Sequence, residues 1–393
     1  MKIPTVLPSV ASIDPQFWFD RSVLLTGHTG FKGAWLSLWL QSLGARVTGL
    51  APAMAPTAPS LYALARVGDQ MFGELAIDIR DALTVHEAVR AARPDVVLHL
   101  AAQPMVRLSL RDPMLTFEVN VLGTVNVLEG VRLAGDSIQA VVVVTSDKCY
   151  ANPSAFAPES EPARVESCKP GDIPDPDPAS TPAPARRFVE GDPLGGHDPY
   201  SSSKACAELV TAAYRDSFFS GPGPRVASAR AGNVIGGGDF GEDRLVPDIL
   251  RAYDAGRPVR VRNPDAIRPW QHVLNPLGGY LALAQALCGP DADDAARAFN
   301  FGPRPRDART VLEIVQCLDG LLDGALSYEL DGAAHPPEAS RLELDSTAAE
   351  HRLGWRPRWD LDEALTRVAG WHEAHRRGED MRHTSLEQIA AFH

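Results

Sequence analysis

Tyr200 and Lys204 carry the clearest chemical signal in the sequence. They stand four residues apart in "YSSSKACAE", at the start of a stretch typical of a helix, so both side chains fall on one helical face. A free tyrosine has a pKa of about 10, too high for an efficient base at neutral pH. A neighbouring ammonium group stabilises the phenolate and lowers that pKa, and the same lysine can bind a nicotinamide ribose. The pair predicts a tyrosine base, although an isolated match of this spacing is more often a packed tyrosine beside an exposed lysine.

A second polar group follows a predicted buried strand. The apolar run at 140–146, "AVVVVTS", is typical of a strand, and Ser146, Asp147 and Lys148 stand at its end. The carboxyl ends of parallel strands face the ligand crevice of a doubly wound sheet. We therefore expect these three side chains to lie near the tyrosine and the lysine.

Three glycines form a turn that suits a phosphate group. Gly27, Gly30 and Gly33 stand between a strand predicted at 22–26 and a helix. Glycine lets backbone N–H groups approach a pyrophosphate, and the helix N-terminus favours the anion. Glycine turns also occur for tight packing alone, but the position of this one after the first strand predicts dinucleotide binding.

The residues for the adenosine end of a dinucleotide are less evident. The next predicted strand, 46–51, ends without the Asp or Glu that commonly holds the ribose hydroxyls. No arginine cluster for a 2′-phosphate follows it either, so the motif leaves NAD and NADP open. Asp78 is a candidate adenine contact, and Lys32 either reaches a phosphate or lies on the surface.

The order of these features predicts an α/β fold. A strand, glycine turn, helix and strand follow one another from residue 22, and the apolar runs at 96–102 and 140–146 suit strands buried on both faces. We expect a doubly wound Rossmann-type parallel sheet with a smaller C-terminal substrate-binding domain. The predicted divisions are an N-terminal extension at 1–20, a dinucleotide-binding Rossmann domain at 21–232 with a proline-rich surface insertion at 151–187, and a mainly substrate-binding domain at 233–393, of which 270–303 returns to the Rossmann domain.

Composition disfavours several classes of function. The chain has 393 residues, a net charge of −12 and a pI of about 5.4, which argues against broad binding to nucleic acid or to an anionic membrane. It has no apolar run long enough to span a bilayer and no signal peptide, so we expect a cytoplasmic protein. The five cysteines are scattered without a C-x-x-C pair, and the histidines of "WHEAH" at 371–375 are three residues apart instead of the four of a zinc-binding helix. We expect neither disulfides nor a metal.

Several segments together resemble a known family. "GHTGFKG", "HLAAQP", "TSDKCY" and "YSSSK" are similar to the extended short-chain dehydrogenase/reductases that act on nucleotide sugars. The CDP-glucose 4,6-dehydratases are resembled more closely still, in "GHTGFKGAWLSLWL", "DPLGGHDPYSSSKACAELV", "RAGNVIGGGDF", "EDRLVPDI", "RPWQHVLNPLGGY" and "RLGWRPRW". The resemblance runs from about Phe17 to the C-terminus. The insertion at 151–187, where the family has a much shorter connection, departs from it, as do the first dozen residues.

The resemblance implies a redox-neutral dehydration of a nucleotide sugar with NAD as cofactor. Tyr200 would take the proton of the sugar 4-hydroxyl while NAD⁺ takes the C4 hydride, and Ser146 would hydrogen-bond the same oxygen. The 4-ketone acidifies the C5 proton, a base removes it, and Asp147 protonates the departing 6-hydroxyl. Return of the hydride to C6 gives a 4-keto-6-deoxy sugar. The resemblance assigns the cofactor to Gly27, Thr29, Gly30, Phe31, Lys32, Gly33, Asp78, Ile79, Leu100, Ala101, Ala102, Gln103, Tyr200 and Lys204.

Lys148 bears on the choice of substrate. Relatives that act on dTDP-glucose have Glu at this position, whereas the CDP-glucose enzymes resemble this chain in having Lys. As the C5 base, Lys148 has to be neutral, which requires desolvation or a neighbouring cation. Alternatively it pairs with Asp147 or with a substrate phosphate, and another group is the base. Asp147 needs the opposite shift in order to stay protonated, and burial would supply it.

Four residues in the middle of the chain are candidates for the substrate. The planar fork of arginine suits a pyrophosphate, and the resemblance makes Arg244 and Arg268 candidates for the nucleotide diphosphate, with Asn233 and His272 as further contacts. For each of them a structural salt bridge or hydrogen bond is the alternative. The family also implies a homodimer or homotetramer and a role in making deoxysugars of surface polysaccharides or lipopolysaccharide.

Other functions remain open at this stage. A 4-epimerase would share the tyrosine and the lysine, but it would not need the acid–base pair of Asp147 and Lys148. A 4,6-dehydratase of another nucleotide sugar would keep all four residues. A non-catalytic dinucleotide sensor of the same fold would commonly lack the tyrosine or the lysine, and both are present.

Overall fold

The structure is a computed structural model that describes residues 13–135, 137–152, 187–324, 326–331 and 342–393. Most of the insertion expected at 151–187 lies outside the described residues. So do Cys168 and the first part of the expected N-terminal extension.

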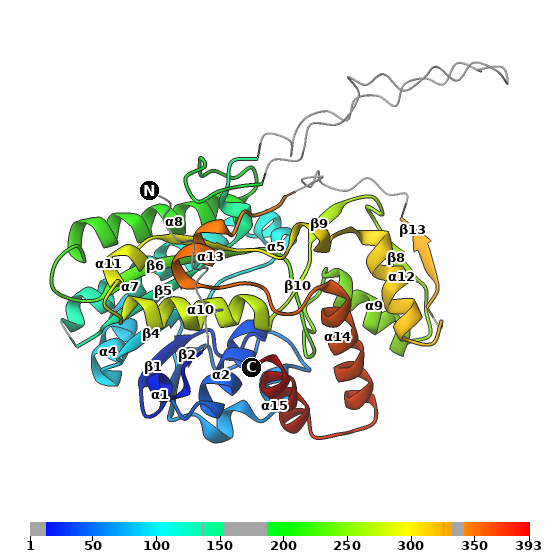
Figure 1. Ribbon diagram of the computed structural model, residues 1–393, viewed down its shortest axis with the longest axis horizontal. Coiled ribbons are helices and arrows are strands. Elements are labelled where there is room, and N and C mark those ends of the chain that lie inside the picture. Colours follow the sequence, from blue (N-terminus) through cyan, green and yellow to red (C-terminus); the bar gives the residue numbers. More distant parts are fainter. Residues whose placement is uncertain (1–12, 136, 153–186, 325, 332–341) are drawn as a thin grey trace, which may run out of the picture.

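A seven-stranded sheet forms the centre of the molecule (Figure 1). Its spatial order is β11-β6-β5-β4-β1-β2-β3, and every neighbouring pair is parallel. This confirms the predicted doubly wound parallel sheet. The strands are β1 (Ser22–Thr26), β2 (Arg46–Ala51), β3 (Gly73–Ala76), β4 (Val96–His99), β5 (Ala140–Val144), β6 (Arg225–Ala231) and β11 (Ala298–Phe301).

The strand order reverses between β1 and β4. From β1 the sheet extends through β2 and β3, and from β4 it extends the other way through β5 and β6. A doubly wound sheet binds its ligand in the crevice outside the carboxyl ends of the strands at such a reversal. The segments that follow β1, β4, β5 and β6 therefore meet at one edge, and they carry most of the predicted site residues.

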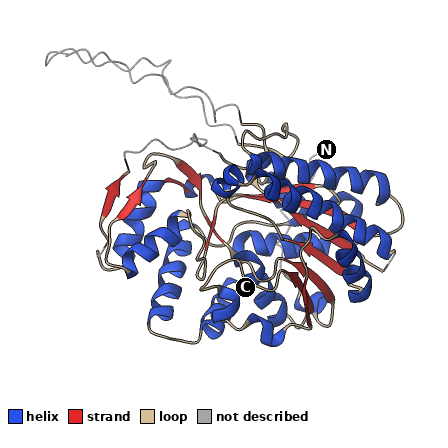
Figure 2. Ribbon diagram, turned by 180° about the vertical axis from the view of Figure 1, so that it is seen from behind, coloured by secondary structure: helices blue, strands red, loops and turns tan. Residues whose placement is uncertain are grey.

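Helices cover both faces of the sheet, as Figure 2 shows from behind. Val23 and Leu25 of β1 belong to one apolar core, whereas Leu24 between them belongs to the other. Burial on both faces explains why these strands read as continuous apolar runs. One face packs against α2 (Phe31–Ser42) and α10 (Leu274–Leu287), with α15 (Met381–Phe392) beside α2, and the other face packs against α4 (Ala82–Ala92), α7 (Gly123–Ala134) and α8 (Pro199–Phe218).

A smaller group of elements, which we call the small lobe, has its own apolar core. Ile249, Val261, Leu318 and Val368 contribute to that core. The chain enters the lobe after β6, returns to the sheet through α10 and β11, and enters the lobe again. The lobe lies to the right of the sheet in Figure 1 and consists of α9 (Leu245–Asp254), β8 (Val259–Val261), α12 (Val311–Leu321), β13 (Tyr328–Leu330) and α14 (Leu361–Arg376).

Short elements connect these layers. Three pairs of short strands, β7 with β10, β9 with β12 and β8 with β13, join the lobe segments. Among the described residues, no helix is long and apolar enough to cross a membrane. The connecting elements are α1 (Pro15–Trp18), α3 (Leu61–Leu64), α5 (Val106–Arg111), α6 (Pro113–Phe117), the π-helical turn η2 (Glu118–Leu122), the 3₁₀ turn η3 (Asp147–Cys149), β7 (Val234–Ile235), β9 (Ile267–Pro269), β10 (Gln271–His272), α11 (Ala292–Ala295), β12 (Ala308–Thr310) and α13 (Thr347–Leu353).

Candidate active site

The glycine turn closes tightly against backbone atoms. Gly27 has a φ of +75°, and a Cβ on it would come within 2.8 Å of the Ala101 backbone. A Cβ on Gly33 would lie 2.1 Å from the Gly27 carbonyl oxygen. Helix α2 begins after Gly30, and no described side chain caps its first N–H groups. These free N–H groups and the helix dipole favour a pyrophosphate, so the turn fits the predicted dinucleotide.

The segment after β4 is fixed to β1 through Thr26. The Thr26 hydroxyl accepts hydrogen bonds from the N–H groups of Leu100 and Ala101, both at 3.1 Å. Because it already accepts twice, we assign its own hydrogen to Nδ1 of His99, 2.7 Å away. Nε2 of His99 then donates to Thr124 at 3.2 Å. Burial lowers the pKa of His99 to about 3, so this ring is a neutral link between the ends of two strands.

Gln103 is held by a residue that the sequence analysis did not single out. Asn120 lies in the π-helical turn, and its side chain accepts from the Gln103 N–H at 2.8 Å and donates to the Gln103 carbonyl at 3.0 Å. It also donates to Ser203 of α8 at 2.9 Å. Asn120 thus joins the end of β4 to the helix that carries the tyrosine and the lysine. Its partners are distant in sequence, so no local pattern marks it, although π-helical turns are frequent at functional sites.

The predicted catalytic residues converge beyond the end of β5. The Ser146 hydroxyl donates to Asp147 at 2.9 Å and accepts from the Lys148 N–H at 3.2 Å. Tyr200 and Lys204 lie in the first two turns of α8, and both side chains are buried. Ser146 and Asp147 both act on the pKa of the Tyr200 phenol, which places them beside it.

Asp147 is a buried carboxyl group. Burial raises its pKa, against the smaller opposing effects of Lys148, the Ser146 hydroxyl and Lys32. This is the direction that a proton donor requires. The space for the carboxyl depends on Gly232, which follows β6, because a Cβ there would lie 2.8 Å from Oδ2 of Asp147.

The pKa of Tyr200 moves against the expectation from the sequence. Burial raises it to about 12, and the groups that lower it are first the Ser146 hydroxyl and then Arg244. Lys204 is itself buried, which lowers its own pKa to about 8. The expected lowering of the tyrosine pKa by Lys204 is therefore wrong for the protein on its own, because burial disfavours the phenolate more than its neighbours stabilise it.

Lys32 reaches the same group from the glycine turn. Burial, together with Lys204 and Arg244, lowers its pKa to about 8, against Asp147 and Asp239, which raise it. Its ammonium group thus acts among the catalytic charges, while the residue as a whole is half-buried. Thr29 and Phe31 flank it in the same turn, and Phe31 packs near Gly236.

A glycine-rich loop after β7 positions Arg244. The Gly237 carbonyl accepts from the Trp35 indole at 3.0 Å, and a Cβ on Gly237 would lie 2.0 Å from the Trp371 ring. The loop is thereby held between α2 and α14. Asp239 follows and pairs with Arg244 at 2.9 Å, and the guanidinium group acts on the pKa of both Tyr200 and Lys32.

The other substrate candidates are placed differently. Asn233 directly follows Gly232 and so lies next to the space that Asp147 occupies. Arg268 lies in β9, and its guanidinium group donates to the Ile267 carbonyl at 3.0 Å.

His272 does not reach the site. It is fully buried, and its ring packs edge-to-face against Trp35 and Trp359, with centroids 6.0 and 4.8 Å away. Burial lowers its pKa to about 3. The assignment of His272 to the substrate is therefore wrong, because the ring fills the aromatic core between α2 and the segment before α14.

Asp78 stands at the outer end of the predicted cofactor groove. Arg80 pairs with it at 2.7 Å and lowers its pKa. The carboxylate keeps 39% of its side-chain surface exposed, so it remains accessible to a ligand. The neighbouring Ile79 packs against Gly123, where a Cβ would lie 2.4 Å from the isoleucine side chain.

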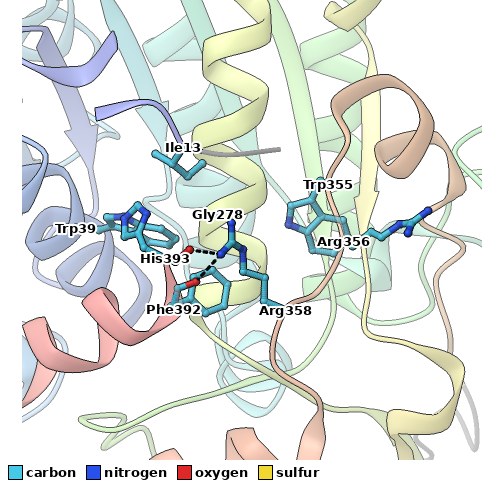
Figure 3. Close-up of a pocket in the computed structure, with 8 residues that line it drawn as sticks. All are labelled: Ile13, Trp39, Gly278, Trp355, Arg356, Arg358, Phe392 and His393. Carbon is cyan, nitrogen blue, oxygen red and sulfur yellow. Dashed lines mark hydrogen bonds between the residues drawn. The ribbon is translucent and has the colours of Figure 1, made fainter. Parts of the chain in front are cut away.

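A separate pocket lies among the C-terminal residues (Figure 3). Its volume of about 20 Å³ holds roughly one water molecule. Arg358 closes it by donating to the Phe392 carbonyl at 3.1 Å. None of its lining residues belongs to the predicted site: Ile13, Trp39, Gly278, Trp355, Arg356, Arg358, Phe392 and His393.

Known proteins resemble the chain over nearly its whole length. Residues 24–170 match the family model of GDP-mannose 4,6 dehydratase, and residues 174–302 match that of the NAD dependent epimerase/dehydratase family. A CDP-glucose 4,6-dehydratase of Salmonella typhimurium is 46% identical over 389 residues, which cover 97% of this chain and 98% of the relative.

Solved structures share the fold at lower identity. The dTDP-glucose 4,6-dehydratase of Streptomyces venezuelae with NAD bound has a TM-score of 0.70 and 23% identity, over 92% of this chain and 99% of that one. The UDP-glucose 4-epimerase of Thermotoga maritima has a TM-score of 0.71 and 19% identity, over 91% and 99%. The glycine turn, the buried acid and the tyrosine–lysine pair thus stand in a chain that belongs to the CDP-glucose 4,6-dehydratase family, among the NAD-dependent epimerases and dehydratases.

Proposed function

We propose that the protein converts CDP-D-glucose to CDP-4-dehydro-6-deoxy-D-glucose. The observation that carries this proposal is the buried carboxyl group of Asp147, with Lys148 beside it, next to the Tyr200 phenol. An epimerase would have no use for such an acid. The 46% identity to a CDP-glucose 4,6-dehydratase supports the choice of nucleotide.

The residues of the glycine turn would hold the cofactor. The free N–H groups of α2 suit its pyrophosphate, the segment from Leu100 to Gln103 lines the crevice beside β1, and Lys204 is the candidate for the nicotinamide ribose. Bound NAD would supply a hydride acceptor for C4, a hydride donor for C6 and, in its oxidised form, a positive charge.

Tyr200 would remove the proton of the sugar 4-hydroxyl, and Ser146 would hydrogen-bond the same oxygen. Since the pKa of Tyr200 is raised to about 12 even with Arg244 lowering it, this transfer is unfavourable until further positive charge stands beside the phenol. Proton removal is thereby linked to the presence of the oxidised cofactor.

Asp147 and Lys148 would carry out the elimination of water. The 4-ketone acidifies the C5 proton, Lys148 takes it, and Asp147 gives its proton to the 6-hydroxyl, which leaves as water. The raised pKa of Asp147 keeps this proton available. Arg244, held by Asp239, would bind the diphosphate of the substrate.

We also propose that the protein works as a homodimer or homotetramer and makes a precursor of surface deoxysugars. The helices on one face of the sheet expose large apolar side chains that a second copy could cover. A charge placed there, as in Leu209→Glu, is expected to give a monomer by light scattering. The exposed side chains are Met114, Leu122, Leu133, Leu209 and Phe218.

The direct test is incubation with CDP-glucose, and separately with dTDP-, GDP- and UDP-sugars, without added reductant. We expect loss of one water from CDP-glucose and no net NADH. An isomer of unchanged mass would identify an epimerase. Dehydration of a different sugar nucleotide would keep the mechanism and reject the cytidine assignment.

A further inference from the structure

We propose that Glu208 is a positioning residue that keeps Lys204 protonated in the catalytic centre. Glu208 lies one helical turn beyond Lys204 in α8 and touches neither the predicted cofactor nor the predicted substrate residues. The inference rests on the proposed function, and it identifies what allows a buried ammonium group to stand one helical turn from Tyr200.

Glu208 lies in a buried, hydrogen-bonded cluster of polar side chains. One carboxylate oxygen accepts from the Thr145 hydroxyl. The other accepts from the Ser228 hydroxyl and from the Arg230 guanidinium group, both at 2.7 Å. The two side chains of this ion pair are only 2% and 4% exposed. Charge-assisted hydrogen bonds are the strong ones in a buried site, so this carboxylate is held firmly in place.

Arg230 is fixed as firmly as its partner. Its guanidinium group donates to the Tyr150 hydroxyl at 2.8 Å and to the Glu190 carbonyl at 3.1 Å. The Tyr150 hydroxyl donates in turn to Asn300 of β11 at 2.7 Å. These bonds fix Arg230 against β6 and β11, so the ion pair joins this part of the sheet to Glu208 of α8.

The spacing in α8 places Glu208 one helical turn from Lys204. Tyr200, Lys204 and Glu208 follow one another at intervals of four residues, which places them on one face of the helix. Within the described part of the chain, Lys204 makes no ion pair of its own. Burying an ammonium group without a negative charge nearby is costly. Burial does lower the pKa of Lys204, to about 8, and Glu208 is the strongest influence that raises it.

The other titratable groups around Lys204 do not replace Glu208. Burial raises the pKa of Cys149 well above its usual range, so the thiol stays neutral. His99 is neutral, and Lys32 is a second cation that repels the first. Tyr200 is a neutral phenol at physiological pH. Among the described residues that act on Lys204, Glu208 is therefore the source of negative charge.

The sign of the expected pH effect follows from the role of Lys204. A lysine supports the phenolate only as the ammonium ion, so activity is present below the pKa of Lys204 and is lost as the pH rises through about 8. Removing the charge of Glu208 lowers that pKa, and the alkaline limb of the activity profile moves to lower pH. A merely structural Glu208 would reduce the rate equally at every pH.

The first experiment compares pH profiles of kcat for the wild type, Glu208→Gln and Glu208→Gln/Arg230→Gln. The double variant guards against an unpaired buried arginine that might prevent folding. We expect the alkaline limb to move to lower pH by about one unit, which is tenfold in the protonation equilibrium. Thr145→Val, which removes one hydrogen bond and leaves the charge, should keep the limb in place. An unmoved limb in both Glu208 variants would overturn the proposal.

The second experiment measures Lys204 without turnover. The chain has only five lysines, so lysine labelled with ¹³C gives a short set of NMR signals, and Lys204→Arg assigns one of them. We expect the signal of Lys204 to titrate at lower pH in Glu208→Gln than in the wild type, and equal titration would refute the inference. Because this readout needs no substrate, it distinguishes a failure of the inference from a failure of the proposed reaction.

Discussion

The catalytic centre and the small lobe hold their positive charges in different ways. Only five of the 38 Lys and Arg residues in the chain are lysines. The three that the structure describes, Lys32, Lys148 and Lys204, all lie in the glycine turn or among the catalytic residues. The segments that build the lobe use arginine instead, and three of these arginines pair with aspartates: Arg244 with Asp239, Arg251 with Asp248 and Arg262 with Asp243.

This difference follows from the chemistry of the two side chains. A guanidinium group stays charged in any protein environment, whereas the pKa of a buried lysine falls readily. Burial lowers the pKa of both Lys32 and Lys204 to about 8. The centre therefore has cations whose charge can change near neutral pH, and the lobe has fixed charges suited to an anionic ligand. Changes in the centre should act on kcat, and changes in the lobe should act on KM.

The largest effect is expected at Tyr200. Tyr200→Phe removes the proposed base and should lower kcat by about 10²–10⁴-fold, while binding of NAD, measured by calorimetry, stays close to that of the wild type. Retained turnover would remove Tyr200 as the base. Loss of NAD binding would show that the variant disturbs the crevice, so it serves as the internal control.

Replacing Lys148 with arginine separates its two possible roles. Lys148→Arg cannot supply a neutral base, so kcat should fall by about 10²–10⁴-fold, and enzyme-bound NADH should accumulate in a single turnover because C4 oxidation still proceeds. Near-normal turnover would mean that position 148 needs only a fixed cation, and that another group removes the C5 proton.

The space beside Asp147 gives a steric test. Gly232→Ala would place a Cβ 2.8 Å from Oδ2 of Asp147, and the displaced acid should lower kcat by up to about 100-fold. Gly191→Ala is the matched control, since a Cβ at Gly191 meets no atom within 4 Å. Equal rates in the two variants would show that Asp147 needs no fixed position.

The reverse exchange in the lobe should be milder. Arg244→Lys keeps the charge but loses the planar fork, so KM for CDP-glucose should rise by roughly tenfold, about 1.4 kcal/mol, with little change in kcat. Steady-state kinetics distinguish the two constants. A fall in kcat without a rise in KM would place Arg244 with the catalytic centre and break the proposed division.

The smallest effect is expected from removing residues 153–186. The described residues on either side are already joined, by a hydrogen bond from the Ala151 N–H to the Pro193 carbonyl at 2.9 Å and by stacking of Tyr150 on Phe188 at 4.9 Å. A short splice should therefore change kcat and KM by less than about twofold. A folded but inactive deletion would assign these residues a part in catalysis or assembly.

Much of the fold was predictable because its signals are local. Continuous apolar runs marked β1, β4 and β5, and the glycines marked the turn before α2. Strand β3 was missed because its four residues, "GELA", alternate between half-buried and exposed positions at the edge of the sheet and form no apolar run.

The site was less predictable because its energetics depend on contacts between distant residues. Motif spacing suggested that Tyr200 and Lys204 belong together, but not that burial would raise the pKa of the tyrosine. His272 was misassigned because the sequence does not show the two tryptophans that enclose it. The ion pair of Glu208 and Arg230 joins a helix to a strand across 22 residues. Helix and strand periodicities relate residues only within one element, so they could not predict this pair.

The pairing of β11 with β6 has a consequence for synthesis on the ribosome. Ala298–Phe301 covers the edge of β6, yet α9, β8 and α10 are all translated between the two strands. Domains generally fold as they emerge, amino-terminal part first, but this sheet keeps an unpaired edge until residue 301 has left the ribosome. The residues of the catalytic centre and part of the lobe have therefore left the ribosome before the sheet is complete. A nascent chain that stalls before β11 exposes the unpaired edge of β6 instead of a finished Rossmann sheet.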